Sequence, residues 1–456
     1  MLTVIDPTTG KLLREVEAAD AQQAQEAITR AHGVYDDWRR SSFDERAEIL
    51  NAVAARMRED IEHLAMLMTE EMGKPIIEAR GEVEKAAWCA EHYAANAEDY
   101  LASETIASDA THSYVQYLPM GVVLGILPWN APFWLAFRFL APTLMAGNTC
   151  LMKHDSHVPG CAEAIAKVFE EVGAPVGLVN NLPLRSPDVE PVIREERVVA
   201  VSVTASDRAG SAVGRTAGEE IKPVVLELGG SDPAIVLADA DLEAAADAIT
   251  TMRMINAGQS CIAAKRIIVE DAVHDEFVEL LTARMGAMTM GDPRDEATQV
   301  GPIAREDLRD ELHQQVQRSV EAGATCVLGG EIPDGEGFFY PPTVLTGVTS
   351  DMAASCEETF GPVAAVLRVT DADEAVRVAN DSPYGLGGSV FTTAERGEAM
   401  AREIVTGQVA VNGIVKTDPR LPSGGVKRSG IGRELGPHGI REFVNTQQVW
   451  IGPKQG

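Results

Sequence analysis

Residues 224–237 read Val-Val-Leu-Glu-Leu-Gly-Gly-Ser-Asp-Pro-Ala-Ile-Val-Leu, and this stretch decides how the fold is divided. It contains two apolar runs, residues 224–228 and 233–237, and each has the length of a buried strand. The glycines and the proline between them exclude one continuous helix or strand. One series of strands therefore ends at Gly230 and a second begins at Pro233, so we place the main domain boundary after residue 229.

Similar apolar runs alternate with amphipathic stretches on both sides of this boundary. The further predicted strands are residues 122–127, 149–152, 198–204, 267–269, 363–369 and 409–411. The predicted helices between them are residues 160–172, 242–256, 273–285 and 373–380. This alternation is typical of parallel sheets covered on both faces, so the predicted fold class is α/β. The first hundred residues are predicted to be helical, with helices in 20–31 and 44–72.

Composition narrows the class of protein and its partners. The chain has 456 residues, a formal net charge of −30 and 45% hydrophobic residues. This length predicts two or three compact units, and the hydrophobic content excludes a disordered chain. The acidic balance disfavours nucleic acid and membranes as partners because both are anionic. The six cysteines form no Cys-x-x-Cys pair, which favours a reducing compartment.

The most hydrophobic stretch, residues 122–144, is long enough to suggest a membrane span. Pro128, Asn130, Pro132 and Arg138 interrupt it, so we predict a buried strand, a loop and a core helix instead. The N-terminus shows no basic start followed by an apolar signal core. We therefore expect a cytoplasmic protein.

Three polar residues lie where apolar patterns end, and each has chemistry that suits a reaction site. Cys261 follows Gly258, where a helical pattern breaks, so its thiol can face a substrate; a structural cysteine is the alternative. Glu227 ends a predicted strand and can act as a general base, or as a cap or ion-pair partner. Asn130 follows another predicted strand, and its amide can donate to an oxyanion or form a turn.

Four short motifs occur together in a familiar order. They are Pro-Trp-Asn at 128–130, Glu-Leu-Gly-Gly at 227–230, Gly-Gln-Ser-Cys at 258–261 and Glu-Thr-Phe-Gly-Pro at 358–362. With this order and spacing the chain resembles the aldehyde dehydrogenase superfamily from end to end. It is most similar to the succinate-semialdehyde dehydrogenase branch, especially in residues 225–232, 258–266 and 424–435.

The resemblance implies an architecture of three parts. A Rossmann-like dinucleotide-binding domain is expected from residues 1–98 and 120–229, and an α/β catalytic domain from residues 230–430. Residues 99–119 and 431–456 are expected to form an oligomerisation arm and a C-terminal tail. The apolar end of this tail would be costly to leave unpaired in water, so we expect a homodimer or homotetramer.

The resemblance also implies a reaction, the NAD(P)-dependent oxidation of an aldehyde to a carboxylic acid. Cys261 would attack the aldehyde carbon, and Asn130 with the backbone N–H of Cys261 would hold the oxyanion. Glu227 would activate the water that hydrolyses the resulting thioester. Succinate semialdehyde is the expected substrate, with a broader semialdehyde or aliphatic specificity as the alternative. A thiol-based ester hydrolase would use the same cysteine and glutamate without a redox step.

For the cofactor the sequence contains no Gly-x-Gly-x-x-Gly fingerprint, so contacts typical of the family are expected instead. The matching positions are Trp129, Lys153, Ser156, Ser206, Glu358 and Phe360. Ser156 stands where NAD-preferring relatives often have a glutamate, and the loss of that charge favours NADP, with NAD possible. Ala205 stands where glycine is usual, which would strain the turn and weaken cofactor binding if a positive φ or a close backbone approach were needed; binding is still expected.

For the substrate, Arg138 matches an arginine that pairs with a distal carboxylate in the succinate-semialdehyde branch. Thr417 and Arg420 lie in a loop that borders the substrate tunnel in relatives. Departures from the family at Ala131, Ser423 and Ile255 predict a roomier pocket. His154 and His157 have no partners at a recognised ligand spacing, so no metal is expected.

Overall fold

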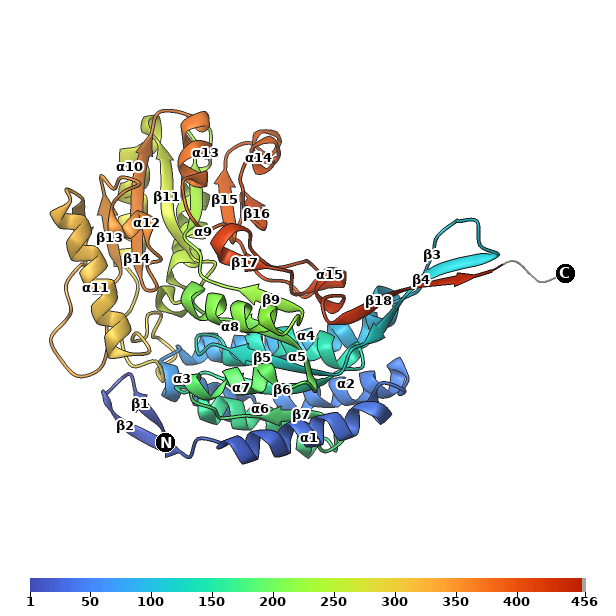
Figure 1. Ribbon diagram of the computed structural model, residues 1–456. Coiled ribbons are helices and arrows are strands. Elements are labelled where there is room, and N and C mark those ends of the chain that lie inside the picture. Colours follow the sequence, from blue (N-terminus) through green and yellow to red (C-terminus); the bar gives the residue numbers. More distant parts are fainter. Residues whose placement is uncertain (453–456) are drawn as a thin grey trace.

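The structure is a computed structural model, and it describes residues 1–452. Within those residues the strands form four sheets, of seven, six, three and two strands. The two larger sheets form the centres of two lobes, and the three-stranded sheet projects from the body as an arm (Figure 1). None of the helices in the described part of the chain is long and apolar enough to cross a membrane.

The six-stranded sheet has the order β17-β9-β8-β5-β6-β7 and is parallel except for β17, which runs antiparallel to β9. Alternate residues of its strands enter two different cores: Val122 and Leu124 pack with α1, whereas Val123 and Leu127 pack with α5. Its strands are β5 (Val122–Leu127), β6 (Thr149–His154), β7 (Val179–Asn181), β8 (Val198–Thr204), β9 (Val224–Glu227) and β17 (Gly430–Ile431).

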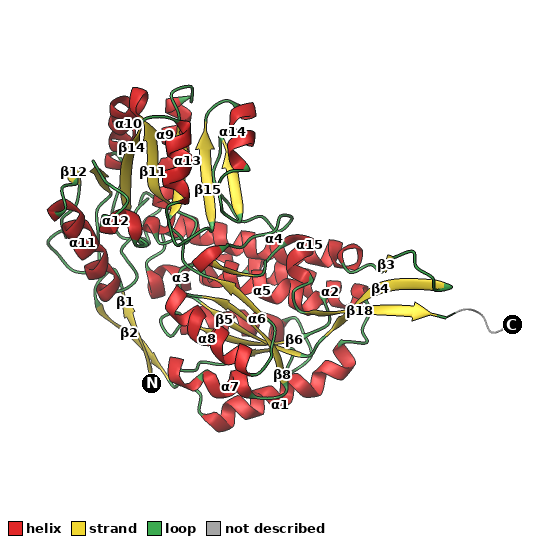
Figure 2. Ribbon diagram, turned by 45° about the horizontal axis from the view of Figure 1, so that its top comes forward, coloured by secondary structure: helices red, strands yellow, loops and turns green. Residues whose placement is uncertain are grey.

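Helices cover both faces of this sheet (Figure 2). Those nearest to it are α1 (Ala21–Trp38), α5 (Pro132–Met145), α6 (Pro159–Glu171), α7 (Glu190–Arg194) and α8 (Asp207–Glu219). Outside α5 lie α2 (Phe43–Glu59), α3 (Ile61–Met72) and α4 (Ile76–Tyr100). Local sequence defines where α1 and α2 begin, because Asp20 with Gln23 and Ser42 with Glu45 form capping boxes.

The seven-stranded sheet has the order β12-β13-β14-β11-β10-β15-β16 and is parallel except for the antiparallel edge strand β12. Its strands are β10 (Asp232–Val236), β11 (Ala264–Glu270), β12 (Thr325–Leu328), β13 (Thr343–Thr346), β14 (Val363–Val369), β15 (Gly387–Phe391) and β16 (Gln408–Val411). Its helices are α9 (Leu242–Met254), α10 (His274–Gly286), α11 (Glu306–Glu321), α12 (Ala353–Cys356), α13 (Ala372–Asn380) and α14 (Ala394–Ala401).

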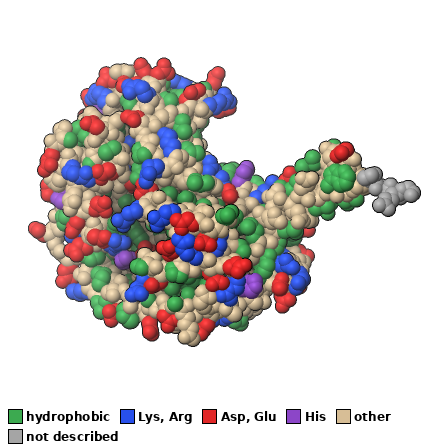
Figure 3. All heavy atoms as spheres, viewed as in Figure 1, with side chains coloured by type: hydrophobic (Ala, Val, Ile, Leu, Met, Phe, Trp, Pro, Cys, Tyr) green, Lys and Arg blue, Asp and Glu red, His purple; other side chains and the backbone are tan. Residues whose placement is uncertain are grey.

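The arm consists of β3 (Glu104–Thr105), β4 (His112–Pro119) and β18 (Val444–Ile451), and β4 lies in the middle. The C-terminal tail therefore pairs with its own chain, from Val444 opposite Pro119 to Ile451 opposite His112. The short helix α15 (Gly436–Ile440) precedes it. Hydrophobic side chains remain visible near the end of the arm (Figure 3), where Trp450 and Ile451 are each 47% exposed.

The α/β class and the predicted strands are confirmed, and strands 122–127, 198–204 and 363–369 coincide with β5, β8 and β14. The predicted interruption of residues 122–144 is also confirmed, because β5, a loop and the buried helix α5 occupy it. The prediction of an all-helical first hundred residues is wrong at the start, where β1 (Leu2–Asp6) and β2 (Lys11–Val16) form a hairpin. Three of the six side chains of β2 are exposed and none is buried, so the strand has no buried face to detect.

The chain passes from one large sheet to the other between β9 and β10, across the Gly-Gly pair at 229–230. The short strand β17 then returns to the six-stranded sheet beside β9. This return brings the loop before β17 close to the ends of both sheets. The domain limits themselves stay a prediction.

Candidate active site

The loop between α9 and β11, which contains Cys261, begins in an unusual backbone conformation. Asn256, Ala257 and Gly258 have φ values of 54°, 52° and 75°. A Cβ atom at Gly258 would lie 2.4 Å from the backbone oxygen of Gly361. Such left-handed turns cost free energy at non-glycine residues and persist only where the surroundings hold them. The cysteine is therefore presented by a tightly fixed turn.

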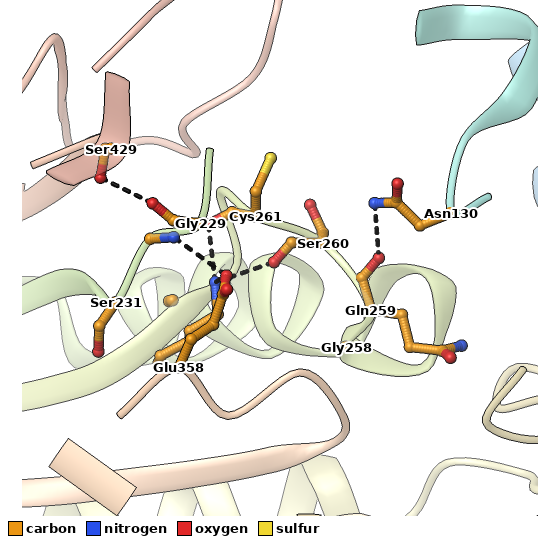
Figure 4. A network of polar contacts seen from close by, with 12 residues as sticks. Asn130, Gly229, Ser231, Gly258, Gln259, Ser260, Cys261, Glu358 and Ser429 are labelled. Carbon is orange, nitrogen blue, oxygen red and sulfur yellow. Dashed lines mark hydrogen bonds and ion pairs between the residues drawn. The ribbon is translucent and has the colours of Figure 1, made fainter. Parts of the chain in front are cut away.

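Amide side chains hold this loop against the end of β5. The Nδ2 of Asn130 donates to the backbone oxygen of Gln259 at 3.1 Å, and the two residues face each other in Figure 4. The Nδ2 of Asn256 donates in turn to the backbone oxygen of Asn130 at 3.0 Å. An amide nitrogen carries two hydrogens, so Asn130 keeps one for another acceptor. The structure thus brings Asn130 to the cysteine loop, as the sequence predicted.

A buried lysine anchors the other side of the same loop. The Nζ of Lys265 donates to the backbone oxygens of Cys261 at 2.7 Å and Ser260 at 2.9 Å. It also forms an ion pair with Glu358 Oε1 at 3.2 Å, and that carboxylate accepts from the N–H of Gly230 (Figure 4). Sequence reasoning missed Lys265, although a charged residue inside the apolar strand β11 was a visible signal.

The thiol of Cys261 is half-buried and surrounded by charges of both signs. Burial raises its pKa to about 11, while Lys265 and Arg138 act in the opposite direction. The group is therefore a neutral thiol at pH 7. Because the thiolate is the nucleophile, attack requires a nearby base to remove the proton.

Glu227 lies at the carboxyl end of β9 in a buried cluster with Arg138 and Glu434. Arg138 Nη2 lies 3.3 Å from Glu227 Oε2 and also forms an ion pair with Glu434. Burial raises the pKa of Glu227 to about 7, with Arg138 lowering it and Glu434 raising it. A carboxyl group near half-protonation at neutral pH suits a general base. Sequence reasoning missed Glu434, which no pattern marks because its partners are distant in the chain.

Arg138 is thus positioned differently from a free substrate-binding cation. Its side chain is 2% exposed and lies between two protein carboxylates. Replacing one partner of such a buried pair leaves the other charge uncompensated. Glu227 and Glu434 already engage the guanidinium, so a substrate carboxylate would have to compete with them. A contact between Arg138 and the substrate stays a prediction.

A cavity of about 380 Å³ opens beside Cys261. Three other residues predicted for catalysis or substrate binding line it, namely Asn130, Arg138 and Thr417. Arg420 does not line it and forms two hydrogen bonds with Asp418, at 2.8 and 2.6 Å. Its predicted role at the substrate has no support from this position.

Three of the predicted cofactor residues, Lys153, Ser156 and Ser206, lie at the carboxyl ends of β6 and β8, where ligands of parallel sheets bind. Lys153 is buried at the end of β6 and forms no ion pair within residues 1–452; burial lowers its pKa. Ser206 caps the N-terminus of α8, accepting from the N–H of Ala209 at 3.4 Å. Two residues before it, the buried hydroxyl of Thr204 has no hydrogen-bond partner among residues 1–452. These groups fit an anionic, polar ligand such as a dinucleotide.

Two aromatic residues border this region. The rings of Trp129 and Phe360 meet edge to face, with centroids 5.7 Å apart. Phe360 is two residues after Glu358, whose carboxylate forms the ion pair with Lys265. The turn at Ala205 is unstrained, because Ala205 does not adopt a positive φ. Alanine at position 205 therefore causes no backbone strain in this turn.

Comparison with known proteins gives these residues a context. The sequence profile described as the aldehyde dehydrogenase family matches residues 1–449. The chain belongs to the aldehyde dehydrogenase family. The resemblance inferred from the four motifs is thus confirmed, and with it the oxidation of an aldehyde with a nicotinamide cofactor.

Relatives and solved structures of this family cover nearly the whole chain. "Succinate-semialdehyde dehydrogenase [NADP(+)] 1" of Mycobacterium tuberculosis is 47% identical over 454 residues, 99% of each chain. "Succinate semialdehyde dehydrogenase [NAD(P)+] Sad" of Escherichia coli is 45% identical, covering 98% of this chain and 97% of its own. The crystal structure of succinic semialdehyde dehydrogenase from Streptococcus pyogenes with NADP⁺ superposes with a TM-score of 0.97 at 37% identity, covering 99% and 100% of the chains. This likeness confirms the aldehyde dehydrogenase fold.

Proposed function

We propose that this enzyme oxidises succinate semialdehyde to succinate, with NADP as the preferred oxidant. The observation that carries the proposal is the end-to-end likeness to relatives named for that aldehyde and that cofactor, at 46–47% identity. The cavity beside Cys261 supports it, because four cationic side chains line it against two acidic ones, Glu78 and Glu82, and much of the remaining wall is apolar. A cation in such a space suits a short aldehyde that carries a carboxylate.

The reaction we propose begins at the thiol. Glu227 accepts the proton of Cys261 as the sulfur adds to the aldehyde carbon, which gives a hemithioacetal. The second amide hydrogen of Asn130 and the backbone N–H of Cys261 stabilise the oxyanion. Lys153, Ser156 and Ser206 would hold NADP, which would supply the hydride acceptor that oxidation of this adduct to a thioester requires. Glu227 releases the thiol proton to solvent, then takes a proton from the water that adds to the thioester and passes it to the departing sulfur, which frees the acid and the thiol.

An aldehyde panel tests the proposed function. NADPH or NADH formation is followed by absorbance with succinate semialdehyde, butanal and a longer semialdehyde acid. We expect the highest kcat/KM with succinate semialdehyde and NADP. A higher value for butanal contradicts the substrate, whereas a higher value for the longer acid favours the broader specificity that Ala131 and Ile255, both lining the cavity, would allow.

The cofactor preference is predicted to depend on Ser156, two residues after His154 at the end of β6. Ser156→Glu should lower kcat/KM for NADP relative to NAD by at least about tenfold, because a carboxylate would face the 2′-phosphate. Ser156→Ala is the matched control, since it removes the hydroxyl without adding charge. Steady-state kinetics with both cofactors give the ratio. An unchanged ratio in Ser156→Glu would assign the preference to another residue.

We further propose that the arm joins copies of the chain into a closed homodimer or homotetramer. The strand β18 forms an edge of the three-stranded sheet and leaves Trp450 and Ile451 half exposed. An apolar edge strand of this length favours pairing with another chain. The unpaired thiols of all six cysteines support a reducing, cytoplasmic location.

Removing the arm's last strand is predicted to break this assembly. A chain that ends at residue 443 should form an assembly of fewer subunits than the full chain at micromolar concentration. Light scattering after size-exclusion chromatography measures the molar mass of each assembly. Trp450→Lys with Ile451→Lys is the milder variant, because it places charge on the edge and keeps the strand. A full-length chain that runs as a monomer contradicts the assembly.

A further inference from the structure

We propose that Lys85 recognises the carboxylate end of the aldehyde substrate, together with Thr417. This inference rests on the proposed function, because it assigns the group that would select a semialdehyde acid over a neutral aldehyde. Lys85 lies on α4 and lines the same cavity as Cys261. No motif of the sequence marks it.

Two other cations of the cavity wall are already neutralised by the protein. Arg138 lies between Glu227 and Glu434. Lys74 forms a buried ion pair with Glu82 and donates to the backbone oxygen of Asn130 at 2.9 Å. A substrate carboxylate at either cation would have to compete with a carboxylate that is already in place, and it would disturb groups that position the catalytic loop or Glu227.

Lys85 is different, because within residues 1–452 it forms no ion pair. Its Nζ donates to Thr417 Oγ1 at 3.0 Å and lies 4.1 Å from the centre of the Trp134 ring. The ring and the hydroxyl orient the ammonium group without neutralising its charge. Lys416 also lines the cavity, but its side chain is exposed and hydrated, so it offers a weaker site for an anion.

The surroundings of Lys85 favour a bound anion. Burial lowers the pKa of Lys85 to about 8, and the nearby Arg138 adds to this, while Glu82 and Asp418 oppose it. The ammonium group is still mainly protonated at pH 7, yet it has lost much of its hydration. A carboxylate bound at Nζ would replace that lost hydration with a charge-assisted hydrogen bond.

Thr417 adds a second hydrogen-bond donor for the substrate carboxylate beside the ammonium group of Lys85. Its hydroxyl accepts from Lys85, and within the described part of the chain it donates to no acceptor. A hydroxyl can accept and donate at once, so its proton is available to the second oxygen of a carboxylate. Apolar side chains, among them Trp134 and Val415, line the cavity that Lys85 shares with Cys261. They suit the methylene groups between an aldehyde and a carboxylate.

The test compares how Lys85 variants treat a charged and a neutral aldehyde. In Lys85→Met, the ratio of kcat/KM for succinate semialdehyde to that for butanal should fall about ten- to a hundredfold, the size of one charge-assisted hydrogen bond. Lys85→Arg should retain most of the ratio, because it keeps a cation at this place. The difference between the two variants separates charge recognition from a loss of packing.

Lys416→Met is the matched control, because it removes the exposed cation of the same wall. A ratio that falls in Lys416→Met and not in Lys85→Met overturns the inference. Lys85→Gln, with Tm and NADP affinity measured alongside, replaces Lys85→Met if that variant does not fold. The ratio of kcat/KM for succinate semialdehyde to that for butanal is measured first in the wild-type enzyme. A wild-type enzyme that prefers butanal contradicts the proposed function. A wild type that prefers succinate semialdehyde, with a preference unchanged in the Lys85 variants, contradicts this inference alone.

Discussion

Cys261→Ala is expected to abolish NADPH formation and to leave NADP binding intact. The thiol forms the covalent adduct, so its removal should lower kcat by roughly 10³- to 10⁶-fold, the range seen when a nucleophile that acts with a base is deleted. The dinucleotide contacts predicted at Lys153 and Ser206 lie on other elements, β6 and α8. Single-turnover absorbance measures the reaction, and fluorescence titration measures cofactor affinity.

The control for this variant is another cysteine that lies far from the cavity. Cys326 belongs to the edge strand β12 and does not line the cavity. Cys326→Ala should therefore retain turnover. Appreciable NADPH formation by Cys261→Ala, or its loss in Cys326→Ala, would contradict the assignment of the nucleophile. Loss of NADP binding in Cys261→Ala would show that the loop supports the cofactor site as well.

Most of the fold could be predicted from the sequence because its signals are local. Strands such as β5 and β8 are nearly continuous apolar runs, as expected for strands buried on both faces. Cys261 and Glu227, the proposed catalytic residues, were also detectable, since each lies where such a pattern ends. The order and spacing of four motifs then identified the family.

The charge partners of the site could not be predicted, because they meet only in three dimensions. Glu434 is 296 residues from Arg138 in the chain, and Lys85 is 332 residues from its partner Thr417. An arginine among phenylalanines in α5 indicated function from sequence alone, but not whether protein or substrate carboxylates surround it. Glu227 and Glu434 supply protein carboxylates to Arg138, whereas Lys85 forms no ion pair within residues 1–452.

The edge strands were missed for a related reason. The strands β2 and β3 have no buried side chain and β17 has only two residues, although β1 buries alternate residues. Their pairing depends on strands elsewhere in the chain or on a tight turn, which hydrophobic periodicity does not detect. The pairing of β18 with β4 is of this kind, since it joins residues more than 300 positions apart.

Glu227→Gln is expected to separate the two halves of the reaction. Glutamine keeps the shape of the side chain but cannot accept a proton, so hydrolysis of the thioester should slow by about 10²- to 10⁴-fold. Some acylation should persist, because thiolate can form slowly by loss of the proton to water. Rapid mixing should show a burst of NADPH followed by slow turnover, and mass spectrometry should find an acyl adduct on Cys261. Failure to trap that adduct contradicts Glu227 as the deacylation base.

Glu434→Gln is the matched comparison, because it removes the other buried carboxylate on Arg138. If loss of negative charge beside Arg138 were sufficient to block hydrolysis, both variants would accumulate the same adduct. We expect accumulation mainly in Glu227→Gln. Equal accumulation would mean that the charge of the cluster matters more than a proton acceptor at residue 227.

The pH dependence of acyl-enzyme hydrolysis tests the role of Glu227 independently. Burial raises the pKa of Glu227 to about 7, and only the carboxylate form can accept a proton. Hydrolysis of the acyl-enzyme should therefore be slow below pH 6, rise through pH 7 and level off above pH 8, the span of about one unit on each side of that pKa. In Glu227→Gln this rise should disappear, whereas in Glu434→Gln it should move to lower pH, because the removed carboxylate raises the pKa of Glu227. A rise that persists unchanged in Glu227→Gln would assign the titration to another group.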